Sequence, residues 1–110
     1  MCTIVIVLDV DTIVAQVLAN LLMEAGYQVI VAKDGAHVAE ILKIVVADFV
    51  VVDLEREVVP ALYGTIPLIG LTSQPETTLP NLQAVLKKPF KPVDLLDLIR
   101  KLVTLYLGEA

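Results

Sequence analysis

Short, nearly uninterrupted runs of branched apolar residues constrain the fold of this chain more than any other feature. Ile4–Leu8 reads IVIVL and residues 49–52 read FVVV, and each run is followed directly by an aspartate, Asp9 or Asp53. A strand with one solvated face alternates apolar and polar side chains, whereas a strand covered on both faces is apolar throughout. The two runs therefore predict strands of a parallel sheet that has helices on both sides.

Strand-like and helix-like segments alternate along the chain, which is typical of a doubly wound α/β fold. The spacing of apolar residues predicts helices over residues 12–25, 34–45 and 92–107. Asp11 is the expected N-cap of the first helix, and Gly26 is its expected C′ residue. The expected fold class is α/β, with a doubly wound, five-stranded parallel sheet whose strands cover residues 4–8, 27–32, 49–52, 67–71 and 84–87.

Two segments interrupt this alternation. Residues 54–66 (LEREVVPALYGTI) and 73–83 (SQPETTLPNLQ) stand where two further helices of a doubly wound fold are expected. The first contains Pro60 and the second contains Pro75 and Pro80. Proline breaks a helix because it lacks an N–H and clashes with the preceding turn. We therefore expect the third and fourth helices to be shortened or missing.

Composition limits the classes of protein to which the chain can belong. With 110 residues, it is expected to form one domain over residues 1–110. The net charge of -5 argues against nucleic-acid binding, which needs a basic surface. No apolar run approaches the roughly 18 residues of a membrane helix, no signal segment opens the chain, and the single Cys2 permits no internal disulfide. A cytoplasmic protein that does not enter a membrane is the expectation.

The first predicted helix is unusually apolar. Hydrophobic residues make up 57% of the chain, above the usual share for a soluble domain. Glu24 is the only charged residue between positions 12 and 25. We therefore expect this helix to offer additional apolar surface to a downstream protein partner or to a second copy in a homodimer.

Five segments of the chain, in this order, resemble the receiver domains of two-component response regulators, the CheY-like family. They are IVIVLDVD, LLMEAGYQVIVAKDG, DFVVVD, PLIGLTS and LKKPF, and together they extend over essentially the whole chain. The resemblance implies a flavodoxin-like, three-layer sandwich and a protein that signals through protein–protein contacts. It implies that the protein is not an enzyme, apart from the phosphorylation and dephosphorylation that receivers carry out on themselves.

The resemblance also implies a set of site residues. Asp53 matches the family's phosphoryl acceptor, which receives its phosphoryl group from a histidine kinase or a phosphotransfer protein. Asp9 matches one of the acidic residues that hold Mg²⁺ together with the acceptor and a backbone carbonyl, which falls at Glu55. Thr72 and Lys88 match the hydroxyl and the ammonium that contact the phosphoryl oxygens. This set is physically coherent, because a carboxylate is a weak nucleophile unless the phosphoryl charge is neutralised.

Two positions depart from the family's pattern. Val10 stands where the family has a second acidic residue, so Mg²⁺ binding is expected to be weak or absent unless Asp11 or the side chain of Glu55 replaces that carboxylate. Val85 stands three residues before the lysine, where the family often has an aromatic side chain that swings inward on phosphorylation. A phosphoryl signal needs a bistable element to act on. The chain is therefore interpreted as an atypical or degenerate receiver.

Two other functions remain open. The first is a phosphorylation-independent pseudo-receiver, an interaction or dimerisation module that keeps the fold without the switch, and Val10 and Val85 favour it. The second is a haloacid-dehalogenase-like phosphatase with Asp9 as nucleophile and Asp11 as general acid and base, because LDVDT resembles that family's Asp-x-Asp motif. That family's threonine would fall at Ile13, however, and no later strand-end acidic pair is available for Mg²⁺.

Overall fold

The structure is a computed structural model, and it describes residues 3–8, 12–54, 66–73 and 82–107. Five strands and three helices lie within these ranges. In chain order they are β1 (Ile4–Leu8), α1 (Thr12–Glu24), β2 (Gln28–Ala32), α2 (Gly35–Leu42), β3 (Phe49–Asp53), β4 (Leu68–Thr72), β5 (Leu82–Lys87) and α3 (Pro92–Leu107).

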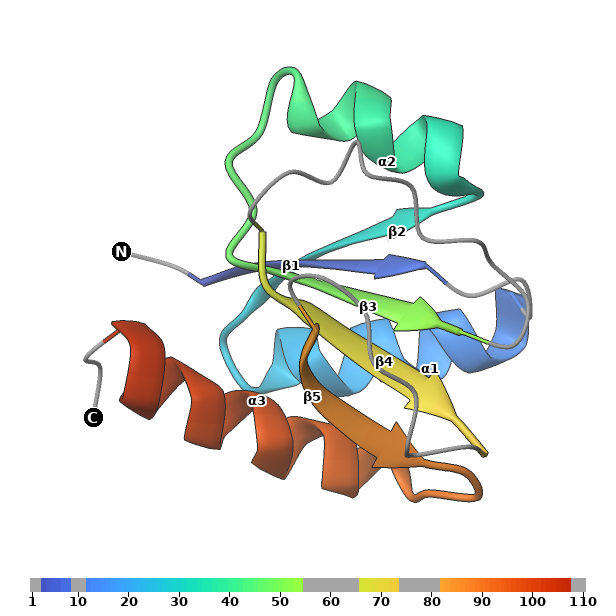
Figure 1. Ribbon diagram of the computed structural model, residues 1–110, viewed down its shortest axis with the longest axis vertical. Helices are drawn as coiled ribbons and strands as arrows, with labels where there is room; N and C mark the ends of the chain where they lie inside the picture. The colour runs from blue at the N-terminus through green and yellow to red at the C-terminus, as the bar shows by residue number, and fades with distance from the viewer. Residues whose placement is uncertain (1–2, 9–11, 55–65, 74–81, 108–110) are drawn as a thin grey trace.

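All five strands are parallel and form one sheet in the order β2-β1-β3-β4-β5. α1 and α3 lie together on one face of the sheet and α2 lies on the opposite face, which gives three layers (Figure 1). This strand order is that of flavodoxin-like, doubly wound sheets, in which ligands bind at the carboxyl ends of the strands. The predicted fold class, a doubly wound parallel sheet in a three-layer sandwich, is confirmed.

Alternate residues of the central strands supply two hydrophobic cores. In β1, Val5 and Val7 pack in the core beneath α1 and α3, whereas Ile6 and Leu8 pack in the core beneath α2. The residues of β3 divide between the two cores in the same way. Because both faces of these strands are covered, an apolar side chain is favoured at every position, which explains the Val/Ile runs of the sequence.

The ends of two helices follow from local sequence. Gly26 has a φ of 99°, a left-handed conformation that glycine adopts without steric cost. The N–H of Tyr27 then donates to the carbonyl of Leu22 at 3.1 Å, which closes α1 and confirms the expected C′ position of Gly26. Asp34 caps α2, because its Oδ1 accepts the N–H of His37 at 2.8 Å.

The second helix is shorter than the sequence predicts. α2 ends at Leu42, whereas the apolar spacing predicts a helix to residue 45. The N–H of Lys43 donates to the carbonyl of Glu40 at 3.2 Å, three residues back, and Ile44 bonds in the same way to Ile41. Such bonds tighten the last turn and end the helix there.

Three strands begin at other residues than predicted, and β2 begins at Gln28, one residue later than expected. β4 begins at Leu68, one residue late, because Pro67 has no N–H for the ladder. β5 begins at Leu82 instead of residue 84, since consecutive residues of β4 pair with Leu82 and Ala84 and the ladder skips Gln83. A one-residue irregularity of this kind is a β-bulge, which depends on the neighbouring strand and leaves little trace in the sequence.

The segments expected to carry shortened helices, residues 54–66 and 73–83, fall largely on residues 55–65 and 74–81. Residues 55–65 and 74–81 lie outside the described residues, so the shortening of the third and fourth helices stays a prediction. Within the described ranges, no helix is both long and apolar enough to span a membrane.

Candidate functional site

Three polar residues predicted from the sequence come together at the carboxyl ends of neighbouring strands. Asp53 ends β3, Thr72 ends β4, and Lys88 directly follows β5. Pairing within the sheet sets their positions: Thr72 lies opposite Lys87, and the N–H of Lys88 donates to the carbonyl of Thr72 at 2.9 Å. The sheet itself therefore places all three residues at one edge, where doubly wound folds bind their ligands.

Asp53 and Lys88 form an ion pair at this edge. Nζ of Lys88 donates to Oδ2 of Asp53 at 2.7 Å. Asp53 is only 3% exposed, whereas the side chain of Lys88 is 27% exposed. A buried carboxylate persists only with compensating charges or hydrogen bonds. The pair is thus a buried anion held by a cation that enters from the surface.

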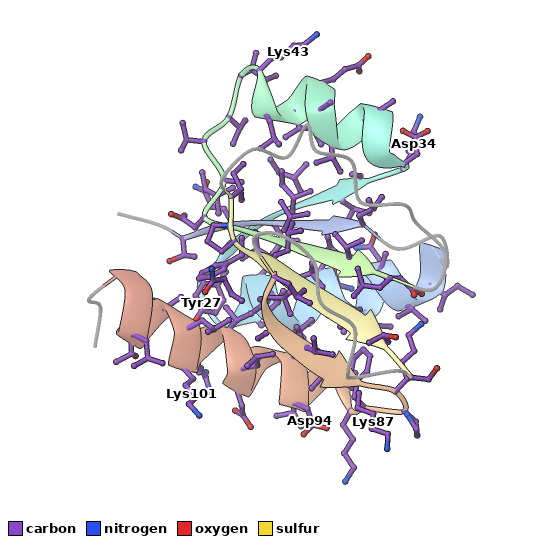
Figure 2. All side chains as sticks on the ribbon, in the orientation of Figure 1. Tyr27, Asp34, Lys43, Lys87, Asp94 and Lys101 are labelled. Atoms are coloured by element: carbon purple, nitrogen blue, oxygen red, sulfur yellow. The ribbon has the colours of Figure 1, made fainter. Side chains whose placement is uncertain are left out.

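The remaining side chains at the ends of β4 and β5 differ in exposure. Thr72 is 2% exposed, so it is buried at the end of β4. Lys87 is exposed and projects outward from the end of β5 (Figure 2). Successive side chains of an extended chain point to opposite sides, which directs Lys88 inward to Asp53 and Lys87 to solvent.

The predicted metal ligands are only partly within the described residues. Asp53 is described, whereas Asp9, Val10, Asp11 and Glu55 lie outside. The described part of the chain contains no group of three or more His, Cys, Asp or Glu side chains that could hold a metal ion. The donor that it does supply, a carboxylate oxygen at the carboxyl edge of the sheet, is of the kind that Mg²⁺ prefers. Mg²⁺ binding stays a prediction.

Val85, the valine at the position where an aromatic side chain was expected, lies in β5. It pairs with Gly70 of β4 and is half-buried. Valine is stiff about its single side-chain torsion and has no ring to move inward. The loss of the aromatic switch therefore stays an inference from the identity of this residue.

The sequence analysis missed two features of this edge. Gly70, inside β4, makes room for Leu54, whose Cδ1 would lie only 2.5 Å from a Cβ at position 70. At the end of β2, the N–H of Lys33 donates to Nδ1 of His37 at 3.0 Å. A glycine inside an apolar strand is a sequence signal for the first feature. An aspartate followed three residues later by a side chain that accepts hydrogen bonds is a signal for the second.

α1 presents apolar side chains to solvent close to this edge. Ile13 is 76% exposed and Val17 is 47% exposed, and Val14 is exposed as well. α1 begins at Thr12, shortly after the carboxyl end of β1, so its first turn lies at the same edge of the sheet as the site. Exposed apolar groups that gather on one helix mark a surface for another protein. The apolar surface predicted for this helix is present.

Comparisons with known proteins bear on the fold. No family model matches the sequence, and no curated protein matches it significantly. Solved structures do match. The chemotaxis response regulator CheY4 of Vibrio cholerae is 22% identical with a TM-score of 0.75, over 92% of this chain and 98% of that chain.

Two further structures agree with this likeness. The receiver domain of the Francisella response regulator 1452 is 22% identical with a TM-score of 0.76, over 91% of this chain and 95% of that one. The receiver domain of a signal transduction histidine kinase from Syntrophus aciditrophicus is 20% identical with a TM-score of 0.74, over 99% and 96%. Together with the strand order and the three layers, these likenesses show that the chain has the fold of the CheY-like response-regulator receiver domains.

Proposed function

We propose that the chain is a receiver domain of two-component signal transduction that accepts a phosphoryl group at Asp53. The observation that carries the proposal is the buried carboxylate of Asp53, whose Oδ2 lies 2.7 Å from Nζ of Lys88, next to the buried Thr72. A nucleophile, a cation and a hydroxyl are the groups that phosphoryl transfer requires, since its catalysis consists mainly of positioning and charge stabilisation.

In the proposed reaction, a carboxylate oxygen of Asp53 attacks the phosphorus of a phosphohistidine on the donor protein. The new O–P bond forms as the N–P bond breaks, and the imidazole leaves with the electron pair of that bond. Nζ of Lys88 and the hydroxyl of Thr72 donate hydrogen bonds to phosphoryl oxygens, where negative charge develops. Because the phosphoryl group passes from one protein to another, the chain acts as a signalling module rather than as an enzyme.

Mg²⁺ is part of the proposal. Asp53 and Asp9 would hold the ion through their carboxylates and Glu55 through its backbone carbonyl or its side chain, and Asp11 is a further candidate ligand. The ion would neutralise charge on the phosphoryl oxygens. Because Val10 supplies no carboxylate, we expect a lower affinity for Mg²⁺ than that of a site with acidic residues at both positions 9 and 10.

The proposed phosphoryl donor is a histidine kinase or a phosphotransfer protein, acting in the cytoplasm. The exposed Ile13, Val14 and Val17 of α1 support a docking surface for this donor, because they lie on the helix that begins at the edge of the site. Output would pass to a downstream protein partner or proceed through homodimer formation.

A titration with Mg²⁺ and beryllofluoride, which stands in for the phosphoryl group, tests the proposal. The amide NMR signals of Asp53, Thr72 and Lys88 are expected to shift saturably, and Asp53→Ala is expected to abolish these shifts. Phosphoramidate, a small phosphodonor, is expected to leave a hydroxylamine-labile phosphate on the wild-type protein and none on the variant. Saturable shifts that persist in Asp53→Ala would sink the assignment of the acceptor.

A phosphorylation-independent pseudo-receiver is the second candidate. Val85 favours it, because a half-buried valine in β5 replaces the aromatic side chain expected of a working switch, and Val10 favours it through the loss of a metal carboxylate. No response to saturating Mg²⁺ and beryllofluoride would support this candidate. The haloacid-dehalogenase-like alternative depends on Asp9 and Asp11, which lie outside the described residues.

A further inference from the structure

A glycine inside β4 makes room for the residue that follows the proposed acceptor. Gly70 lies between the buried Ile69 and Leu71. A Cβ atom built on Gly70 would lie 2.5 Å from Cδ1 of Leu54 and 3.1 Å from Cδ1 of Leu82. Since real Cβ atoms essentially never approach another heavy atom closer than 3.0 Å, any side chain here would displace Leu54. The volume over Gly70 is occupied by two leucines from the neighbouring parts of the fold.

Leu54 is attached to β4 at two points. Its N–H donates to the carbonyl of Leu71 at 3.0 Å, which extends the pairing of β3 with β4 by one residue beyond Asp53. Its side chain lies over Gly70 and packs against the core beneath α2. Because Leu54 is bonded directly to Asp53, these two contacts restrict how far the end of β3 can move relative to β4.

The same packing includes the third strand of the site. Leu82 begins β5, and Lys88, whose Nζ bonds to Asp53, follows the other end of that strand. Leu54 and Leu82 both occupy the space over Gly70. Side chains thus join β3 and β5 above β4, in addition to the main-chain ladders that connect the three strands.

We propose that Leu54 is a positioning residue for phosphoryl transfer, acting through Asp53. Its side chain, packed over Gly70, holds the end of β3 so that the carboxylate of Asp53 stays within hydrogen-bond distance of Nζ of Lys88. This inference rests on the proposed function of Asp53 as acceptor. An error of about 1 Å in the placement of a reacting group lowers a rate by about 100-fold, so a modest shift of Leu54 is enough to have a kinetic effect.

The test uses two substitutions that disrupt the packing of Leu54 over Gly70, together with two control substitutions. Gly70→Ala adds a methyl group that displaces Leu54 without altering it, and Leu54→Ala removes the side chain. Leu54→Met keeps the volume with a flexible side chain. Leu42→Ala is the matched control, because Leu42 is another half-buried leucine that packs against the core beneath α2 but lies in α2 itself.

Two quantities are measured under conditions in which a urea denaturation curve shows each variant to be folded. The first is the rate of acyl-phosphate formation from phosphoramidate at saturating Mg²⁺. The second, without any phosphodonor, is the pair of NMR signals from the carboxyl carbon of Asp53 and the ammonium nitrogen of Lys88. A leucine that contributes only to stability changes neither quantity in the folded protein.

Gly70→Ala and Leu54→Ala are expected to slow acyl-phosphate formation by about tenfold or more, and to shift the carboxyl signal of Asp53. Leu54→Met and Leu42→Ala are expected to stay within about twofold of the wild-type rate, with no such shift. Once Leu54 is replaced by alanine, Gly70→Ala is expected to add no further loss, because both changes act through the same side chain.

Equal rates for Leu54→Ala and Leu42→Ala, with an unmoved Asp53 signal, would overturn the positioning role and leave the proposed function intact. A wild-type protein that forms no acyl phosphate would overturn the proposed function instead. The carboxyl and ammonium signals then decide the role of Leu54 by themselves. If these NMR signals shift in Leu54→Ala but not in Leu42→Ala, the result supports the role of Leu54 in positioning Asp53. If they do not shift in Leu54→Ala, that role is overturned. If Gly70→Ala does not fold, the comparison of Leu54→Ala with Leu54→Met gives the same decision.

Discussion

Two aspartates lie at the two ends of β3, at opposite edges of the sheet: Asp48 directly precedes the strand and Asp53 is its last residue. Oδ2 of Asp48 accepts the N–H of Ile4 at 2.8 Å, and the N–H of Asp48 donates to the carbonyl of Ile4 at 2.8 Å. Oδ2 of Asp53 faces the ammonium of Lys88 at 2.7 Å. The carboxylate of Asp48 therefore accepts a hydrogen bond from the main chain at the start of β1, and that of Asp53 accepts one from a flexible lysine side chain.

The main-chain N–H that bonds to Asp48 and the ammonium that bonds to Asp53 differ in mobility. A main-chain N–H within a sheet is fixed, and it satisfies a carboxylate for as long as the sheet is formed. A lysine ammonium on a four-carbon stem can move, and so can pass its hydrogen bond from a carboxylate to a phosphoryl oxygen. The side chain of Lys88 is 27% exposed, which leaves it access to solvent and to an incoming group. The hydrogen bond at the amino edge is thus fixed by the main chain, whereas the ion pair at the carboxyl edge includes a side chain that can move, as the proposed function requires.

Replacing each carboxylate by an amide is expected to give the largest contrast between the two edges. Asp53→Asn is expected to abolish acyl-phosphate formation, because an amide is not a competent nucleophile toward phosphorus. Asp48→Asn keeps an oxygen that accepts the N–H of Ile4, so the rate is expected to change by less than about twofold. Hydroxylamine-labile phosphate after incubation with phosphoramidate and Mg²⁺ is the measurement. Residual labelling of Asp53→Asn would place the acceptor at another residue.

Removing the cation from the carboxyl edge is expected to have the next largest effect. Lys88→Met keeps most of the side-chain volume and removes the charge that stabilises the phosphoryl oxygens, so the rate of acyl-phosphate formation is expected to fall by about 100-fold. Lys87→Met is the matched control, since Lys87 is the neighbouring lysine and is exposed. Its rate is expected to stay near that of the wild type. Equal losses in the two variants would show that general surface charge, rather than contact with Asp53, matters for the reaction.

Adding a carboxylate to the carboxyl edge is expected to have a smaller, opposite effect. Val10→Asp supplies an acidic residue at position 10, next to Asp9, and is expected to raise the affinity for Mg²⁺ by about tenfold. Val10→Asn is the control, because asparagine has nearly the same shape as aspartate but no charge. Mg²⁺ titrations followed through the amide signals of Asp53 and Thr72 give both affinities. An unchanged affinity would indicate that Asp11 or Glu55 already replaces the missing carboxylate.

Periodicity and order predicted that strand ends meet at the carboxyl edge, whereas the choice of Asp53, Thr72 and Lys88 as site residues came from the resemblance to receiver domains. Asp53 and Thr72 each end an apolar run, and Lys88 follows the last one. In a parallel sheet the carboxyl ends of the strands lie along one edge, so residues after neighbouring strands become neighbours in space. The alternation of side chains predicts that one of Lys87 and Lys88 points outward, and the resemblance to receiver domains identifies Lys88 as the inward one.

The amino edge and the packing over β4 could not be predicted in this way. The hydrogen bond from Ile4 to Asp48 joins residues 44 positions apart, and it requires that β1 and β3 be adjacent. The packing of Leu54 over Gly70 likewise depends on which strands pair and in which register. A single sequence contains the residue types of such contacts but not the pairing that brings them together.

The smallest expected effect concerns the stability of the amino edge. Asp48→Ala removes the carboxylate that accepts the N–H of Ile4. Hydrogen bonds to charged groups contribute about 1.5–3 kcal/mol, and because Asp48 is half-buried, water restores part of this, so the free energy of unfolding is expected to fall by about 1–2 kcal/mol. Urea denaturation with an unchanged m value is the measurement. Asp48→Asn, which keeps the acceptor, is the control and is expected to lose less.

The rate of acyl-phosphate formation in folded Asp48→Ala decides whether the two edges are independent. Four residues of β3 separate Asp48 from Asp53, and both neighbouring strands hold β3 through main-chain hydrogen bonds that the substitution leaves in place. We therefore expect a less stable protein with a rate near that of the wild type. A tenfold slower rate in fully folded protein would mean that the start of β1 controls the placement of Asp53 through the strand, because a small displacement of the nucleophile is enough for such a loss. The carboxylate of Asp48 would then belong to the site, and the division of the sheet into a structural and a reactive edge would be wrong.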